Sequence, residues 1–124
     1  MKIVKLVLFI LFGLMFLNAG LNKFFNYMPM PELTPEQIKF FTAFASISWM
    51  IPLIATIEII GGILVMIPKT RALGAIVILP VMTGILVHHS TVDPSGLVMA
   101  LVLMAINILA IVDNWGKYQG LIRD

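Results

Sequence analysis

One acidic residue, Glu58, stands within an apolar stretch of the sequence that runs from about 48 to 67. It precedes Pro68 by ten positions, which is about 15 Å along a helix that rises 1.5 Å per residue. If this stretch crosses a membrane, Glu58 lies near the middle of the bilayer, where a charge costs at least ~2.5–3.5 kcal/mol. We therefore expect Glu58 to face the interior of a helix bundle, either protonated or partnered.

Two polar residues in other apolar stretches fall at a similar depth. Counted from the ends that share its membrane side, Asn18 and Thr83 lie about 18–20 Å deep. A polar layer of Glu58, Asn18 and Thr83 across three helices is therefore allowed by geometry. Its carboxyl could accept a proton or contact a quinone, or the layer could consist only of hydrogen bonds that fix helix packing. Both interpretations stay open.

Lys23, His88 and His89 are candidate residues at the outer mouth of the same helices. As a lone cation, Lys23 is expected to extend to water. The alternative is that it pairs with an inward carboxyl, although Glu58 lies about 12 Å deeper along the axis, so direct contact would need a tilt or a water bridge. Adjacent histidines point about 100° apart on a helix, and no third ligand stands at a useful spacing, so we expect no metal site. We interpret the two histidines as interfacial polar residues, with a proton relay or hydrogen bonding to quinone by His88 as the alternative.

The elements that carry these residues are unusually apolar. Of the 124 residues, 60% are hydrophobic and 11% are charged, and the mean hydropathy is +1.07. A soluble domain has about 25% charged residues, and a chain this short cannot enclose so much apolar surface in water. The absence of cysteine excludes disulfides and thiolate chemistry, and a net charge of +2 is too small for a nucleic-acid surface. The composition predicts an integral membrane protein.

Four apolar stretches are each close to the length that spans a ~30 Å hydrocarbon layer, so they predict four transmembrane helices. The first could be a signal peptide, but Leu17 stands three residues before the candidate cut, where a small residue is required, so we expect a span. Glycines in the second and third stretches predict that these two helices pack closely. The predicted fold is an all-α bundle in a single domain of residues 1–124, with spans at about 4–21, 48–67, 72–89 and 96–112.

A further, shorter helix is predicted between the first two spans. Thr34 is a suitable N-cap, a proline follows at the first helical position, and Gln37 can complete a capping box. The residues after it are amphipathic, with Phe41 and Phe44 on the apolar face. We predict a surface helix over about 35–45 that lies in the membrane interface.

Basic residues are unequally divided between the two membrane sides that this topology implies. If the N-terminus is cytoplasmic, the inner side holds six of them and the outer side two. The positive-inside rule then predicts that both termini are cytoplasmic, in an inner membrane of bacterial type. The inner residues would be Lys2, Lys5, Lys69, Arg71, Lys117 and Arg123, and the outer ones Lys23 and Lys39.

Four features of the sequence resemble those of the DoxX and DoxX-like membrane proteins. The most informative is residues 57–64, where Glu58 precedes paired glycines. Residues 68–75 resemble the basic inner turn of that family, and two histidines close the third span as they often do there. The opening motif is carried by Gly13, Phe16, Leu17, Gly20, Lys23 and Phe24.

The resemblance implies a four-helix membrane bundle linked to quinone-dependent sulfur oxidation or to oxidative-stress complexes, beside partner subunits. One hypothesis is a redox-associated subunit that contacts quinone through the Glu58 layer. The alternative is a non-enzymatic anchor or structural subunit of a larger membrane complex. A small transporter fits less well because no inverted repeat is visible. No cofactor is evident apart from quinone as a candidate, and the expected partners are lipid, other membrane subunits or further copies of the chain.

Overall fold

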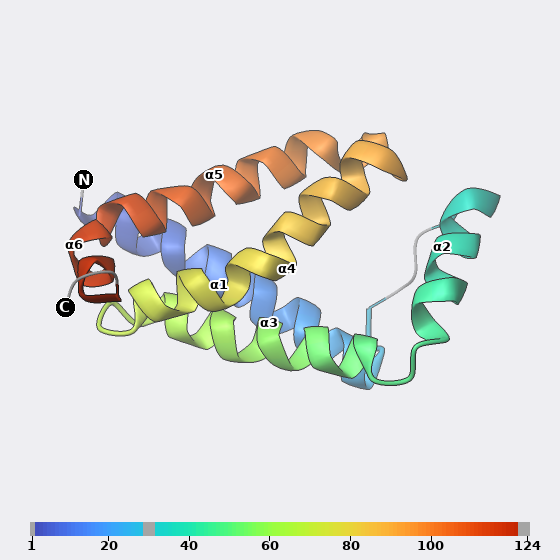
Figure 1. The fold of residues 1–124 in the computed structure, drawn as a ribbon, viewed down its shortest axis with the longest axis horizontal. Helices are drawn as coiled ribbons and strands as arrows, with labels where there is room; N and C mark the ends of the chain where they lie inside the picture. Colours follow the sequence, from blue (N-terminus) through green and yellow to red (C-terminus); the bar gives the residue numbers. More distant parts are fainter. Residues whose placement is uncertain (1, 29–31, 122–124) are drawn as a thin grey trace.

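The computed structural model describes residues 2–28 and 32–121, and helices dominate both segments (Figure 1). Two short 3₁₀ turns, η1 and η2, accompany the helices. The prediction of an all-α fold is confirmed. The elements are α1 (Lys2–Phe25), α2 (Pro35–Ala45), α3 (Met50–Met66), α4 (Arg71–Thr91), η1 (Pro94–Gly96), α5 (Leu97–Asp113), α6 (Trp115–Tyr118) and η2 (Gln119–Leu121).

Three segments are long and apolar enough to cross a membrane: α1, α4, and η1 joined to α5. A fourth span results if α2 and α3 are taken together, although the two meet at a bend of 90°. The predicted count of four spans is therefore approximate, because α3 by itself has only 17 residues. It is shorter than the predicted span because Trp49 is its N-cap and Ile67 its C-cap.

The short helix between the first two spans begins where its capping signals predicted. The Thr34 side chain accepts a hydrogen bond from the Gln37 backbone N–H at 3.2 Å, and the Thr34 N–H donates to the Gln37 side chain at 3.0 Å. Figure 1 shows α2 beside the end of the bundle, running across the direction of α3. Its position in the membrane interface stays a prediction.

The long helices pack in sequence, α1 against α3, α3 against α4 and α4 against α5, while α5 touches α1 only narrowly (Figure 1). Aromatic rings from α1 fill the centre of this arrangement against side chains of α3 and α4. In lipid there is little hydrophobic gain between helices, so close van der Waals packing must hold them together. The largest fully buried apolar side chains are Phe9, Phe16, Val65, Ile78 and Met82.

Glycines bring the α1 and α3 backbones into contact. A Cβ atom on Gly62 would lie 2.6 Å from the Gly13 carbonyl oxygen, and one on Gly20 would lie 2.6 Å from the Ala55 carbonyl oxygen. The second and third spans, α3 and α4, pack closely as expected: a Cβ atom on Gly74 would lie 2.6 Å from the Val65 backbone nitrogen. The close packing of the first span on the second also depends on glycines, and the sequence argument did not include it.

The start of α1, the end of α5 and the start of α4 meet at one end of the bundle. The Lys5 ammonium lies 2.7 Å from the Asp113 carboxylate, and the Tyr118 hydroxyl donates to the Ala72 carbonyl at 2.6 Å. Arg71 is buried there: its Nε donates to the Val65 carbonyl at 2.8 Å. This end therefore gathers basic residues of the predicted inner side; Arg123, also assigned to it, lies outside the described residues.

Candidate functional site

Glu58 is the most completely buried acidic residue among those described. Helix α3 presents it to α1, and only 3% of its side chain is exposed. The Lys23 ammonium of α1 lies 2.6 Å from Glu58 Oε1, and the Lys23 side chain is 33% exposed. The expectation that Glu58 faces the bundle interior and is either protonated or partnered is met by a direct ion pair.

This contact corrects the expectation that Lys23 extends to water and favours the alternative, pairing with an inward carboxyl. The register of α1 on α3 is set at Gly20, which lies level with Ala55 and Ile59 and therefore with the turn that contains Glu58. Lys23 is three residues further along α1, about 4.5 Å of rise. Helical side chains also point back toward their own N-terminus, so in these antiparallel helices the two side chains approach each other.

The ammonium is the polar group that satisfies the buried carboxylate. Glu58 Oε1 has no accessible surface, and no hydrogen bond of good angle reaches it within the described part of the chain. The contact with Lys23 is therefore an ion pair rather than a well-directed hydrogen bond. Because a buried carboxylate without a partner is very costly, this one pair decides whether Glu58 can stay charged.

Asn18 and Thr83 do not join Glu58, so the predicted three-residue layer is not formed. The Tyr27 hydroxyl donates to the Asn18 carbonyl oxygen at 3.0 Å and also to the Asn18 side chain, whose amide nitrogen lies 3.3 Å from Met28 Sδ. Thr83 is exposed and donates to the carbonyl of Leu79, in its own helix, at 2.8 Å. Two side chains at equal depth on two helices need not face each other. Whether they do depends on the rotation of each helix about its axis, which a count of residues along the axis does not give.

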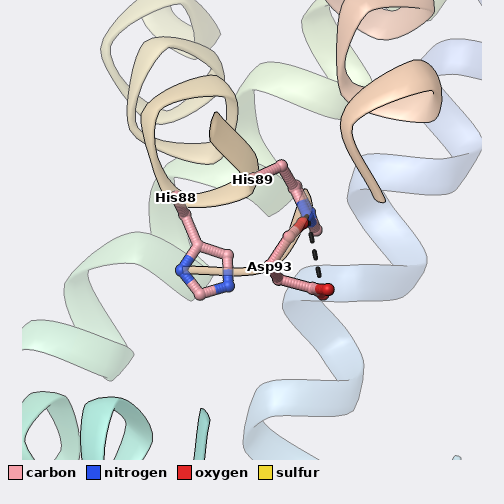
Figure 2. Close-up of side chains that lie close together, drawn as sticks. All are labelled: His88, His89 and Asp93. Atoms are coloured by element: carbon pink, nitrogen blue, oxygen red, sulfur yellow. Dashed lines mark hydrogen bonds and ion pairs between the residues drawn. The ribbon is translucent and has the colours of Figure 1, made fainter. Parts of the chain in front are cut away.

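His88, His89 and Asp93 come together where α4 ends (Figure 2). His89 Nδ1 lies 3.0 Å from the Asp93 carbonyl oxygen and 3.6 Å from the Asp93 carboxylate. One ligand atom from each of the three residues lies within 4.8 Å of the others. The sequence argument did not include Asp93 among the candidate ligands, although its spacing of four from His89 was a usable signal.

Helix α2 covers His88 with aromatic rings. The His88 ring centroid lies 4.6 Å from that of Phe40 and 5.7 Å from that of Phe41. Phe44, on the predicted apolar face, stacks on Phe40 instead, at 5.7 Å. The contact of α2 with α4 therefore runs mainly through Phe40, which lay outside the predicted apolar face.

A pocket of about 510 Å³ lies beside this cluster. Its walls come from the first turn of α2 and from the segment between α4 and α5. It contains two carboxylates, and it offers space for water or a small polar ligand. The lining residues are Thr34, Pro35, Glu36, Gln37, Val92, Asp93, Pro94 and Ser95.

Comparison with known proteins gives a family but no individual relative. A model of the DoxX family matches residues 4–90, which carry all but the first two residues of α1, all of α2 and α3, and all but the last residue of α4. No curated protein and no solved structure matches the chain at a significant level. The matched region contains Lys23, Glu58 and both histidines, whereas Asp93 lies beyond it. The chain is an integral membrane protein of the DoxX family.

Proposed function

We propose that this protein is a quinone-associated subunit of a membrane redox complex, and that the Lys23–Glu58 pair contacts the quinone head group. The observation that supports this is a carboxylate buried in the bundle whose single ammonium partner is one-third exposed. The pair thus links an interior acid to the surface of the helices. A lipid-soluble ligand can reach Lys23 from the membrane without entering a closed cavity.

The pair has the donors and acceptors that both redox forms of a quinone require. An ammonium has three N–H donors, so Lys23 can bond a quinone carbonyl while it keeps its contact with Glu58. A carboxylate accepts hydrogen bonds only, which suits the hydroxyl of a quinol. The role of this chain is to bind the head group and exchange protons, and a partner subunit with a redox centre supplies or takes up the electrons.

The surface next to Lys23 is aromatic and apolar. Phe24 and Phe25 follow it at the end of α1 and are 47% and 72% exposed. Rings at the edge of a polar contact provide stacking surface for a planar head group. The end of α1 therefore combines an ammonium donor with exposed aromatic rings.

A binding measurement with a short-chain quinone tests this function. Purified protein in lipid nanodiscs is titrated with the quinone, and Lys23→Met and Glu58→Gln should each weaken binding at least tenfold. Asp113→Asn alters the other α1 ion pair and is the matched control, so it should bind as the wild type does. Absence of saturable binding by the wild type, or equal binding by all four proteins, would contradict the proposal.

The alternative, a non-enzymatic anchor or structural subunit, is favoured by one observation. Glu58 already has a charged partner, as a residue that serves only to hold α1 on α3 would. In that case the double variant Lys23→Met/Glu58→Met should still assemble with its partner subunits and support their activity. Loss of activity in an assembled complex would instead favour the quinone contact.

We also propose that both ends of the chain face the cytoplasm of a bacterial-type inner membrane. The ion pair of Lys5 with Asp113 supports a common side for the two ends, since it holds the start of α1 beside the end of α5. The larger number of basic residues at these ends supports the cytoplasmic side. The chain has no cysteine, so single reporter cysteines are free of background. An impermeant maleimide applied to intact cells should label Lys39→Cys and leave Lys2→Cys and Lys117→Cys unlabelled. The reverse pattern would contradict this orientation.

A further inference from the structure

The backbone at the end of α4 folds back so that Asp93 returns toward the last helical turn. The N–H groups of Val92 and Asp93 both donate to the His88 carbonyl oxygen, at 2.7 and 3.2 Å. Pro94 then starts η1 and ends the reversal. This turn brings the Asp93 carboxylate to the two adjacent histidines as a third possible ligand.

The distances between the three side chains are close to those in a metal site. Ligand atoms bonded to one ion at 2.0–2.2 Å are about 3–3.5 Å apart in tetrahedral geometry. His89 Nδ1 and the Asp93 carboxylate are already 3.6 Å apart, and all three ligand atoms lie within 4.8 Å. Small side-chain rotations, with His89 Nδ1 exchanging its contact with the Asp93 carbonyl for the ion, would therefore bring the set onto a single ion.

His88 presents its Nε2 toward Asp93, while Nδ1 lies on the far side of the ring (Figure 2). Its Nδ1 has no accessible surface and no hydrogen-bond partner among the described residues. A buried polar atom left in this state costs about 1–3 kcal/mol. Phe40 and Phe41 hold the ring on one side, and apolar groups around a metal ligand limit the access of water.

We propose that His88, His89 and Asp93 bind one divalent transition-metal ion of the Zn²⁺ type, with its open coordination positions toward the pocket beside α2. Two imidazoles and one carboxylate are a donor set that such ions prefer. Asp93 belongs both to the cluster and to the wall of the 510 Å³ pocket. Glu36 brings a second carboxylate to that wall, and the remaining positions take water or a small ligand.

The site is separate from the proposed quinone contact. Glu58 and Lys23 belong to α3 and α1, whereas the metal ligands come from the end of α4 and the turn after it. Asp93 also lies outside residues 4–90, the part that matches the family. Metal binding and quinone binding can therefore fail or succeed independently.

Calorimetric titration with Zn²⁺ alone tests the site on the full chain, purified in detergent without a histidine tag. The wild type should bind one ion per chain, and His88→Ala and Asp93→Asn should each weaken binding at least tenfold. Asp113→Asn removes a carboxylate at the opposite end, and Glu58→Gln removes the buried one, so both should bind Zn²⁺ as the wild type does.

Absorption spectroscopy with Co²⁺ gives a second readout, independent of the heat measured by calorimetry. Co²⁺ should give visible absorption bands of a nitrogen- and oxygen-ligated ion in the wild type but not in Asp93→Asn. If His88→Ala does not fold, Asp93→Asn decides, because this asparagine keeps the oxygen that accepts from Ser95. Binding that is unsaturable, or that is unchanged in folded Asp93→Asn, would overturn the proposal.

Discussion

Among the described residues, two ion pairs tie α1 to other helices, and their nitrogen–oxygen distances are almost equal. Lys23 lies 2.6 Å from Glu58, and Lys5 lies 2.7 Å from Asp113. The two lysine side chains are about equally exposed, at 33% and 36%, but the acids differ, at 3% and 35%. Because an ion pair in water contributes little and one taken out of water is costly to break, burial of the acid distinguishes the pairs.

The difference in burial follows from how closely the helices approach. Around Glu58, glycines allow the α1 and α3 backbones to touch, and the contact leaves no room for water. Around Asp113, α1 meets α5 over only a narrow contact. Helix packing, rather than the charges themselves, therefore makes the Lys23–Glu58 pair more costly to break than the Lys5–Asp113 pair.

The largest effect is expected from Lys23→Met, which leaves the Glu58 carboxylate buried without a partner. Breaking a buried pair on one side costs 3–5 kcal/mol, and we expect about 3 kcal/mol because Lys23 is partly exposed. The free energy of unfolding, measured by titration with a denaturing detergent, should fall by that amount.

The matching double variant, Lys23→Met/Glu58→Met, should restore most of this stability, because replacing both charges with apolar groups is often neutral. Infrared spectra of Lys23→Met should also show a protonated carboxyl band that is absent from Lys23→Met/Glu58→Gln. Equal stability of Lys23→Met and the wild type would remove the energetic distinction between the two pairs.

Gly20→Ala should expose the Lys23–Glu58 pair, so that it becomes more like the Lys5–Asp113 pair. The new Cβ would lie 2.6 Å from the Ala55 carbonyl oxygen, so α1 must move away from α3 beside Glu58. Overpacking of this kind costs about 1–3 kcal/mol. Gly84→Ala is the control, since a Cβ there meets nothing within 4 Å. Thermal unfolding of both variants in detergent would measure the difference, and equal melting temperatures would contradict the proposed close contact.

At the opposite end, Tyr118→Phe should cost about 1 kcal/mol, because it removes the hydrogen bond to the Ala72 carbonyl. Burial raises the pKa of the Tyr118 phenol above its ordinary value near 10. The folded state therefore holds this proton more tightly than the unfolded state, and its contribution to stability is lost as pH rises above about 10. Denaturation curves at increasing pH should show this loss in the wild type and a smaller loss in Tyr118→Phe.

The smallest effect is expected from Asp113→Asn. Both side chains of that pair are about one-third exposed, so we expect a cost of about 0.5 kcal/mol. High salt should reduce this cost further, because exposed charges are screened. A loss of stability as large as that of Lys23→Met, measured in the same detergent titration, would show that burial does not separate the two pairs.

The burial of Glu58 could be predicted from the sequence, whereas its pairing with Lys23 could be named only as an alternative. The cost of a charge in lipid depends only on depth, and depth follows from counting residues along a helix. The partner depends on which helix faces α3 and at what register, and these follow from the contact at Gly20. For the same reason Asn18 and Thr83, which the residue count placed at a similar depth, were wrong as neighbours of Glu58.

By itself, the sequence determined the apolar composition, the helical stretches, the capping box at Thr34 and the need to shield one buried acid. These are local properties, set by residue type and by periodicity along the chain. Only the tertiary structure decided that Lys23 neutralises Glu58, that Phe40 covers His88, and that Asp93 returns to the two histidines. Those contacts depend on the rotation of each helix about its axis and on how one turn reverses the chain, which no count along a single helix contains.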